Sequence, residues 1–170
     1  MKGIIFFLVV VCYLSTTLGK EVILNGTALA GCTSHGECWF FNASLWENNT
    51  LPEANDTVII GTTPSGTSLY IDSGISFGSL AITATHFELM VSESAVVDIE
   101  NITLSGGVLS LWGQAQVIGR YSSQFLSSAK LHINDWGRFG QLGVNFLLDE
   151  KSSIEAYNYG HLELYLSLIN

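Results

Sequence analysis

The chain has 170 residues, of which 15 are Asp or Glu and 6 are Lys or Arg, giving a formal net charge of −9. This length fits a single domain. The scarcity of cations excludes binding through clustered Lys and Arg, which nucleic acids and sulfated glycans require. No Lys or Arg occurs from Glu21 to Gly119, although ten Asp and Glu fall there. A hydrophobic content of 48% excludes a disordered chain but indicates no particular chemistry.

Residues 1–19 follow the pattern of a secretory signal peptide. Lys2 precedes an apolar run from Ile4 to Leu14, and small residues continue to Gly19. The alternative is a membrane anchor, but that would need about 20 apolar residues. Residues 1–19 are therefore predicted to be cleaved, leaving a secreted or cell-surface chain without a membrane span.

Cleavage would leave two cysteines, Cys32 and Cys38, and their close spacing in an oxidising compartment predicts a disulfide. Zinc would need two further ligands. His35 lies between the cysteines, but no second Cys or His follows at the usual spacing. Calcium would need a regular Asp-rich loop, which the sequence lacks. No metal and no cofactor are expected.

Glycosylation is predicted at five Asn-x-Ser/Thr sequons, more than chance would give. They lie at Asn25, Asn42, Asn48, Asn55 and Asn101. Residues 20–57 hold four of the five, together with the cysteine pair, and share no repeat with the rest of the chain. This segment is predicted to be an N-terminal cap that covers the strand edges of the first repeat.

Five segments that start at intervals of 20 to 23 residues share one pattern. They begin at Leu69, Leu89, Leu109, Leu131 and Ile154. Each has two apolar residues at alternate positions, three turn-like residues, and again two small or apolar residues at alternate positions. Alternation with period two indicates strands, and a further apolar stretch in most intervals raises the number to about three strands per repeat.

A repeat of this length cannot bury its own apolar residues, so residues 58–170 are predicted to stack as a parallel β-helix of about five turns. An antiparallel sandwich or barrel, the alternative, does not explain the recurring register. Equivalent residues should form internal columns. The expected columns are Leu69, Leu89, Leu109, Leu131 and Ile154; Ile71, Val91, Leu111, Ile133 and Ala156; Phe77, Val97, Val117, Phe139 and Leu162; and Ile75, Ala95, Ala115, Gly137 and Gly160. The last column shrinks along the chain, and Trp112, Trp136, Tyr157 and Tyr159 are expected to compensate for its lost volume.

The lead into the repeats contains a Trp, a Pro, an Asp, an alternating Val-x-Ile, a further Asp and a Leu-x-Ile. These are Trp46, Pro52, Asp56, Val58, Ile60, Asp72, Leu80 and Ile82. Over about forty residues this pattern resembles the opening of the G8 domain, although most of the glycines of that family are missing. The chain is also similar to the pectin-lyase superfamily of β-helices. The resemblance implies an extracellular β-rich module and carries over no catalytic residues.

Two groups of side chains are candidates for function. The outward strip Tyr70, Met90, Ser110, His132 and Glu155 is flat and mixed, and it would either bind a glycan or a protein or lie under the cap. Glu93 and Asp135 share a column with Gly113 between them, about 10 Å apart, slightly beyond the range of an inverting carboxylate pair. We interpret both as exposed bend residues.

These observations favour a non-catalytic, secreted or cell-surface glycoprotein module. It would act in adhesion, in the matrix, or in recognition of a glycan or another extracellular protein, alone or as the N-terminal part of a larger surface protein. The alternative is a polysaccharide-active enzyme or its inactive remnant. No nucleic acid partner is expected. The C-terminal end lacks a polar closing segment, so self-association there is a further expectation.

Overall fold

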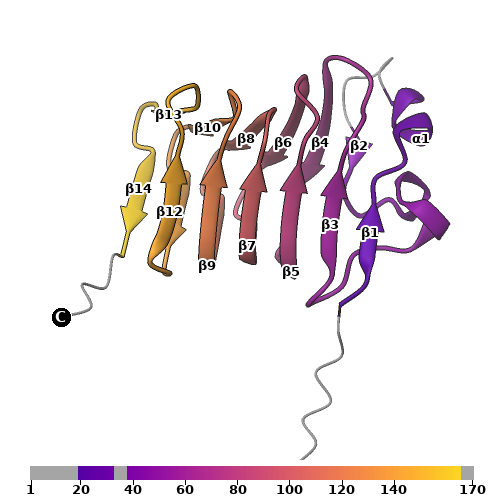
Figure 1. Cartoon of the computed structure of the whole chain (residues 1–170), viewed down its shortest axis with the longest axis horizontal. Helices are drawn as coiled ribbons and strands as arrows, with labels where there is room; N and C mark the ends of the chain where they lie inside the picture. Colours follow the sequence, from indigo (N-terminus) through magenta and orange to yellow (C-terminus); the bar gives the residue numbers. More distant parts are fainter. Residues whose placement is uncertain (1–18, 33–37, 166–170) are drawn as a thin grey trace, which may run out of the picture.

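The computed structural model describes residues 19–32 and 38–165, and within them the chain coils into a parallel β-solenoid of about five turns (Figure 1). The predicted signal peptide lies outside the described residues, apart from Gly19. One side of the coil is a six-stranded sheet. In spatial order its strands are β2 (Cys38–Trp39), β4 (Thr67–Ile71), β6 (Phe87–Val91), β8 (Val108–Leu111), β10 (Lys130–Ile133) and β13 (Ser153–Ala156).

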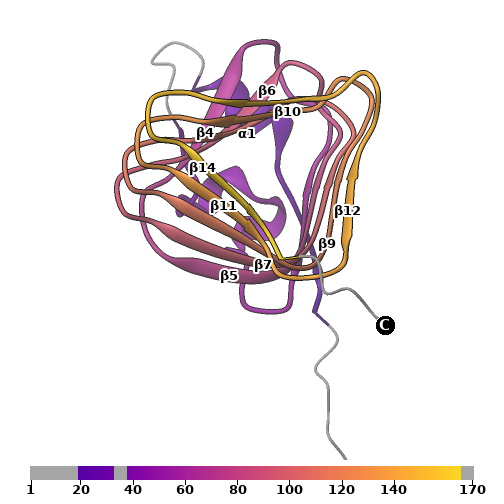
Figure 2. The same cartoon turned by 90° about the vertical axis from the view of Figure 1, so that its left-hand side faces the viewer.

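An eight-stranded sheet forms the other two sides. Its strands are β1 (Glu21–Ile23), β3 (Thr57–Ile60), β5 (Ile75–Ile82), β7 (Val96–Leu104), β9 (Gln116–Phe125), β11 (Arg138–Gln141) and β14 (His161–Leu164), with β12 (Asn145–Leu148) paired to β9. The first half of β9 pairs with β11 and its second half with β12, so the sheet turns a corner. A register shift between Ile99 and Asn101 marks that corner in β7. Seen end-on, the coil is three-sided (Figure 2).

The pairing register confirms the first two predicted columns. Leu89 lies opposite Leu69 and Leu109, and Val91 lies opposite Ile71 and Leu111. All six of these side chains are at most 1% exposed. Parallel pairing of every strand with the equivalent strand of the next turn therefore builds the interior, as expected from the repeat.

The first members of the other two columns were wrong. Phe77 pairs with Ile99, and Val97 pairs with Ile75 instead. The bend between β4 and β5 is shorter than the equivalent bends of later turns, so the expected alignment slips by two residues. From Val97 onward the column is correct, because Val97 pairs with Val117.

Two polar side chains lie within the core. Ser123 and Gln141 are both 0% exposed, and the Ser123 hydroxyl donates a hydrogen bond to Gln141 Oε1. Gln141 Nε2 in turn donates to the carbonyl oxygen of Gly143 at 3.3 Å. Gly119 makes room for this pair, because a Cβ at that position would overlap the Gln141 amide oxygen. These two buried polar side chains are therefore hydrogen-bonded to each other, as buried polar groups usually are.

Residues before the first repeat extend both sheets. β1 pairs with β3, and β2 pairs with β4. Between them the chain forms the helix α1 (Gly26–Ala30) and the short 3₁₀ turns η1 (Ala43–Leu45) and η2 (Glu47–Asn49). Phe40 stacks on Phe77 and meets Trp46 edge-on, and Trp46 Nε1 donates to Phe40 O at 2.8 Å. The assignment of residues 20–57 as a cap stays a prediction.

Most residues that carry the G8 resemblance belong to the core. The buried ones are Trp46, Pro52, Asp56, Val58, Ile60, Leu80 and Ile82, whereas Asp72 is exposed. Val58 pairs with Leu80 and Ile60 with Ile82, so the Val-x-Ile and Leu-x-Ile patterns lie on neighbouring strands. The shared pattern therefore describes packing at the start of the solenoid.

Candidate functional site

The predicted outward strip forms one continuous row on the outer face of the six-stranded sheet. The register places Tyr70, Met90, Ser110, His132 and Glu155 side by side on successive strands. Trp39 on β2 pairs with Tyr70 and extends the row, with ring centroids 5.8 Å apart. The sequence did not reveal Trp39, because β2 has only two residues and lies outside the repeat. The row is aromatic at its N-terminal end and polar at its C-terminal end.

Ser110 differs from the expectation that it would be exposed. It is 0% exposed, and its hydroxyl donates to Glu88 Oε1 at 2.5 Å. Ser110, His132 and Glu155 occupy adjacent strands in the order of a nucleophile, a base and an orienting acid. However, a serine nucleophile must donate to the histidine, and here the Ser110 proton goes to Glu88. The row therefore lacks the hydrogen bond that defines such a triad.

Glu155 lies at the centre of a small polar cluster. Its Oε2 accepts a hydrogen bond from the Tyr157 hydroxyl and lies 3.7 Å from His132 Nε2. The Tyr157 hydrogen bond, aided by the nearby His132, lowers the pKa of Glu155 below its ordinary value, and the same bond raises the pKa of Tyr157. Glu155 is therefore an anionic hydrogen-bond acceptor at neutral pH.

A polar groove of about 410 Å³ crosses the starts of β4, β6, β8 and β10 on the same face. Its lining includes His86, Glu88, Lys130 and His132, together with several Ser and Thr residues. Gly107 also lines it, with φ at +69°, and a Cβ there would come within 2.7 Å of the Ala84 carbonyl oxygen. The groove therefore contains a cationic donor in Lys130, an anionic acceptor in Glu88 and several neutral hydroxyl groups. This combination is suited to a ligand rich in hydroxyl groups.

Exposed aromatic rings gather at the opposite ends of these strands, where the chain bends toward the next sheet. Trp112, Trp136, Tyr157 and Tyr159 are 40%, 55%, 49% and 60% exposed. These four residues are named the aromatic corner. The expectation that they compensate for lost core volume was wrong, because their rings lie outside. Trp136 and Tyr159 stack with centroids 4.3 Å apart and an interplanar angle of 11°.

The bend that positions these rings recurs in four successive turns, after β6, β8, β10 and β13. Glu93, Gly113, Asp135 and Asn158 each have a φ between +53° and +66°, so the backbone turns in the same left-handed way at equivalent positions. Asn158 Nδ2 donates to Asp135 Oδ1 at 3.0 Å, which ties two successive bends together. Equivalent bends place rings of successive turns above one another, and this explains the stacking of Trp136 on Tyr159.

Glu93 and Asp135 are separated by Gly113 in this row of bends. The Gln114 amide bonds the Glu93 carbonyl, and the Trp136 amide bonds the Gly113 carbonyl. Glu93 is exposed, and Asp135 accepts the hydrogen bond from Asn158. Their positions match those of bend residues, and no observation assigns them acid–base chemistry.

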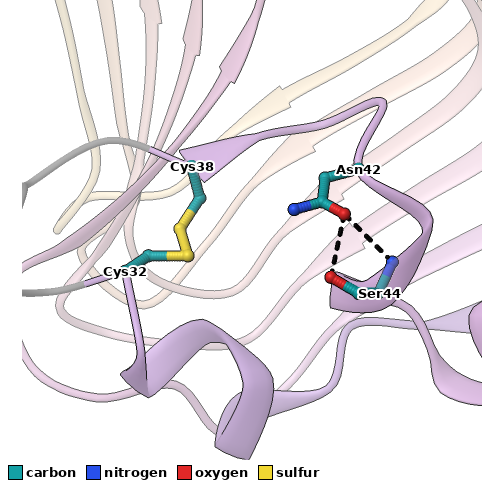
Figure 3. Close-up of a disulfide and its surroundings, with 4 residues drawn as sticks. All are labelled: Cys32, Cys38, Asn42 and Ser44. Atoms are coloured by element: carbon teal, nitrogen blue, oxygen red, sulfur yellow. Dashed lines mark hydrogen bonds between the residues drawn. A yellow bond between two sulfur atoms is a disulfide. The ribbon is translucent and has the colours of Figure 1, made fainter.

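The predicted disulfide is confirmed: Cys32 and Cys38 are bonded, with Cα atoms 5.7 Å apart (Figure 3). This separation is ordinary for a disulfide. His35 lies outside the described residues. No group of three or more metal-ligating side chains occurs within residues 19–32 and 38–165.

Two of the sequon asparagines cap short helical segments with their side-chain oxygens. Asn25 Oδ1 accepts from the Thr27 and Ala28 amides, and Asn42 Oδ1 accepts from the Ser44 amide and hydroxyl (Figure 3). These bonds engage the oxygen rather than Nδ2, the atom that would carry a glycan. The other three sequon asparagines are in η2 (Asn48), before β3 (Asn55) and on β7 (Asn101). No sequon asparagine belongs to a strand of the six-stranded sheet.

In the part of the chain that the structure describes, no helix is long and apolar enough to cross a membrane. Comparison of the chain with protein-family models, curated proteins and solved structures found no match.

Proposed function

We propose that the chain is a non-catalytic, extracellular recognition module that binds a neutral glycan on the outer face of its six-stranded sheet. One observation carries this proposal. The polar groove crosses the starts of the strands and the aromatic corner follows their ends, and the row between them contributes His132 to the groove. Hydroxyl groups of a sugar would bind in the groove, and its apolar ring faces would stack on Trp136 and Tyr159.

The charge pattern favours a neutral ligand. The chain has a net charge of −9, and Lys130 shares the groove with Glu88. Glu155 adds a second carboxylate to the same face. A polyanionic ligand would be repelled by these groups, whereas carboxylates readily accept hydrogen bonds from neutral sugar hydroxyls.

Two features support secretion and a free sheet face. The Cys32–Cys38 disulfide is typical of an oxidising compartment. The five sequons all lie off the strands of the six-stranded sheet, so no glycan would be attached to a strand of that sheet. The G8 resemblance points to the same extracellular setting.

The experiment is a binding measurement with protein secreted by cultured cells. A panel of neutral and acidic oligosaccharides is titrated by calorimetry, and we expect binding to neutral members only. The paired variant Trp136→Ala and Tyr159→Ala should weaken binding at least tenfold, about 1.4 kcal/mol. Tyr121→Ala is the matched control, since Tyr121 is 59% exposed but lies on β9. Folded protein that binds no member of the panel would overturn the proposal.

The same preparation also tests the catalytic alternative. Polysaccharides are incubated with the protein, and reducing ends or unsaturated products are followed over time. We expect no turnover. Sustained turnover that is lost in Glu93→Gln or Asp135→Asn would establish an enzyme and overturn the non-catalytic proposal.

A further inference from the structure

The chain enters the fold at Lys20, where its backbone meets a buried carboxylate. The Lys20 amide nitrogen donates to Asp56 Oδ1 at 3.0 Å, and the Thr57 amide donates back to the Lys20 carbonyl at 2.9 Å. Asp56 is only 4% exposed. Lys20 directly precedes β1, so this contact fixes the start of the eight-stranded sheet.

The other oxygen of Asp56 is also engaged. Asp56 Oδ2 accepts from the Glu53 amide at 2.8 Å and lies 3.8 Å from Lys20 Nζ. The Lys20 side chain is 47% exposed, so its ammonium is largely hydrated. A buried carboxylate is costly unless it is paired, and here its short contacts are to neutral amides.

The preceding position has two notable properties. A Cβ at position 19 would overlap the carbonyl group of Asn55, so the intact chain admits only glycine there. Thr17 and Gly19 are also small residues at alternate positions after the apolar run, the pattern of a signal-peptide cleavage site. Glycine at position 19 therefore avoids a clash with Asn55 and also fits the small-residue pattern of a cleavage site.

We propose that the Gly19–Lys20 peptide bond is the processing site, and that the amino group released there binds the buried carboxylate of Asp56. This inference rests on the secretion included in the proposed function. A signal-peptide-cleaving endopeptidase hydrolyses the bond with one water. Gly19 leaves as the new carboxylate, and the Lys20 nitrogen gains a hydrogen and is protonated to an ammonium.

The released ammonium strengthens the hydrogen bond to Asp56. A neutral amide donor 3.0 Å from Oδ1 becomes a full positive charge at the same place. Hydrogen bonds between two charged groups are roughly twice as strong as neutral ones. The α-amino group is largely protonated at neutral pH, with an ordinary pKa of about 7.7–8.0. Processing therefore stabilises the junction between β1 and the turn that contains Asp56.

The first test is the N-terminal sequence and intact mass of the protein secreted by cells. We expect a chain that begins at Lys20. The variant Gly19→Ala keeps a small residue at the cleavage site but would clash with Asn55 if it remained in the fold. We expect Gly19→Ala to be secreted, cut at the same bond and as stable as the wild type. A mature chain that retains residue 19, or begins after Lys20, would overturn the proposal.

The second test measures the ammonium directly and does not depend on secretion or glycan binding. Chains that begin at Lys20, Gly19 or Thr17 are released from a fusion partner by a protease. At pH 6.5 we expect the Lys20 chain to melt about 3–5 °C above the two longer chains. Equal melting temperatures would overturn the proposal, whatever the outcome of the glycan titrations.

Substitutions then assign the effect to Asp56. In Asp56→Asn, the difference between the Lys20 and Gly19 chains should fall below about 1 °C. Glu53→Gln is the matched control, because Glu53 is an exposed carboxylate in the same turn, and the full difference should remain. A difference that persists in Asp56→Asn would assign the effect to another group. If Asp56→Asn does not fold, the comparison of the three unsubstituted chains still decides the proposal.

Discussion

Ser123 and Gln141 form a hydrogen-bonded pair inside the solenoid, with the serine hydroxyl donating to the glutamine amide oxygen and both side chains fully buried. They occur on β9 and β11, strands of successive turns. A polar group left without its partner in such a place costs about 1–3 kcal/mol, whereas replacing both partners can be nearly neutral.

We expect Ser123→Ala and Gln141→Leu each to lower the free energy of unfolding by about 1–3 kcal/mol. The double variant should lose less than the sum of the two, because neither side chain is then left in the core without the other. Urea unfolding of the four proteins measures this coupling. Ser122→Ala is the control, since Ser122 is only half-buried and bonds Asn101 instead. Strictly additive losses would contradict the pairing.

Glu155 should titrate at a lower pH than an ordinary glutamate, because the Tyr157 hydroxyl stabilises its charged form. A carboxylate whose pKa is lowered in the folded state adds stability above its unfolded pKa of about 4.3, and this stability is lost as the pH falls through the folded value. Asp149, whose pKa is lowered mainly by the Ser152 side chain, acts in the same direction. Stability should therefore fall as the pH drops below about 4.

Carboxyl carbon NMR shifts measured against pH would follow Glu155 individually. Tyr157→Phe should return its titration toward the ordinary value. Tyr165→Phe is the matched control, because Tyr165 bonds Glu163 and should leave Glu155 unchanged. An unaltered Glu155 titration in Tyr157→Phe would show that a group other than Tyr157 lowers the pKa of Glu155.

The repeat of apolar residues was sufficient to predict the solenoid and much of its register. Leu89 and Leu109 pair as expected because a side chain that points inward in one turn must stack on an inward side chain of the next. The slip at Phe77 could not be predicted, since nothing in the sequence shows that the first bend is shorter than the later ones. Bends tolerate changes in length that strand pairing does not.

The candidate site was predicted only in part. The row from Tyr70 to Glu155 follows from the same alternation that predicts the core. In the core, Gln141 lies at an inward position where the alternation predicts an apolar residue. Its hydrogen bond with Ser123 was therefore not predicted from the sequence. The four residues of the aromatic corner were identified from the sequence but given the wrong role, because an aromatic residue in a bend fits the pattern equally well inside the core or stacked outside it.

Removing the disulfide should destabilise the chain without changing its fold. In Cys32→Ser with Cys38→Ser, the unfolded chain regains the freedom of a short loop, and we expect a loss of about 2 kcal/mol. Urea unfolding with and without dithiothreitol measures this. Reduced wild type should match the double variant, and the double variant should not respond to the reductant. Equal stability of oxidised and reduced wild type would contradict this account.

The last turn exposes side chains that equivalent positions elsewhere bury. Leu148, Leu162 and Leu164 are 40%, 39% and 39% exposed, whereas Phe125 and Phe139, which pair with the first two, are 0% exposed. Within the described residues no further turn covers them. We therefore expect two copies to associate through this end, because burying these side chains removes apolar surface from water.

Sedimentation velocity over a range of concentrations would measure that association. Leu162→Glu should weaken it at least tenfold, about 1.4 kcal/mol, by placing a charge in the contact. Leu147→Glu is the control. Leu147 is 50% exposed, but the alternation along β12 points it outward, away from the interior that is uncovered at this end. If both variants weakened the association equally, the contact would involve the side of the solenoid. A wild-type chain that stays monomeric at all concentrations would contradict association altogether.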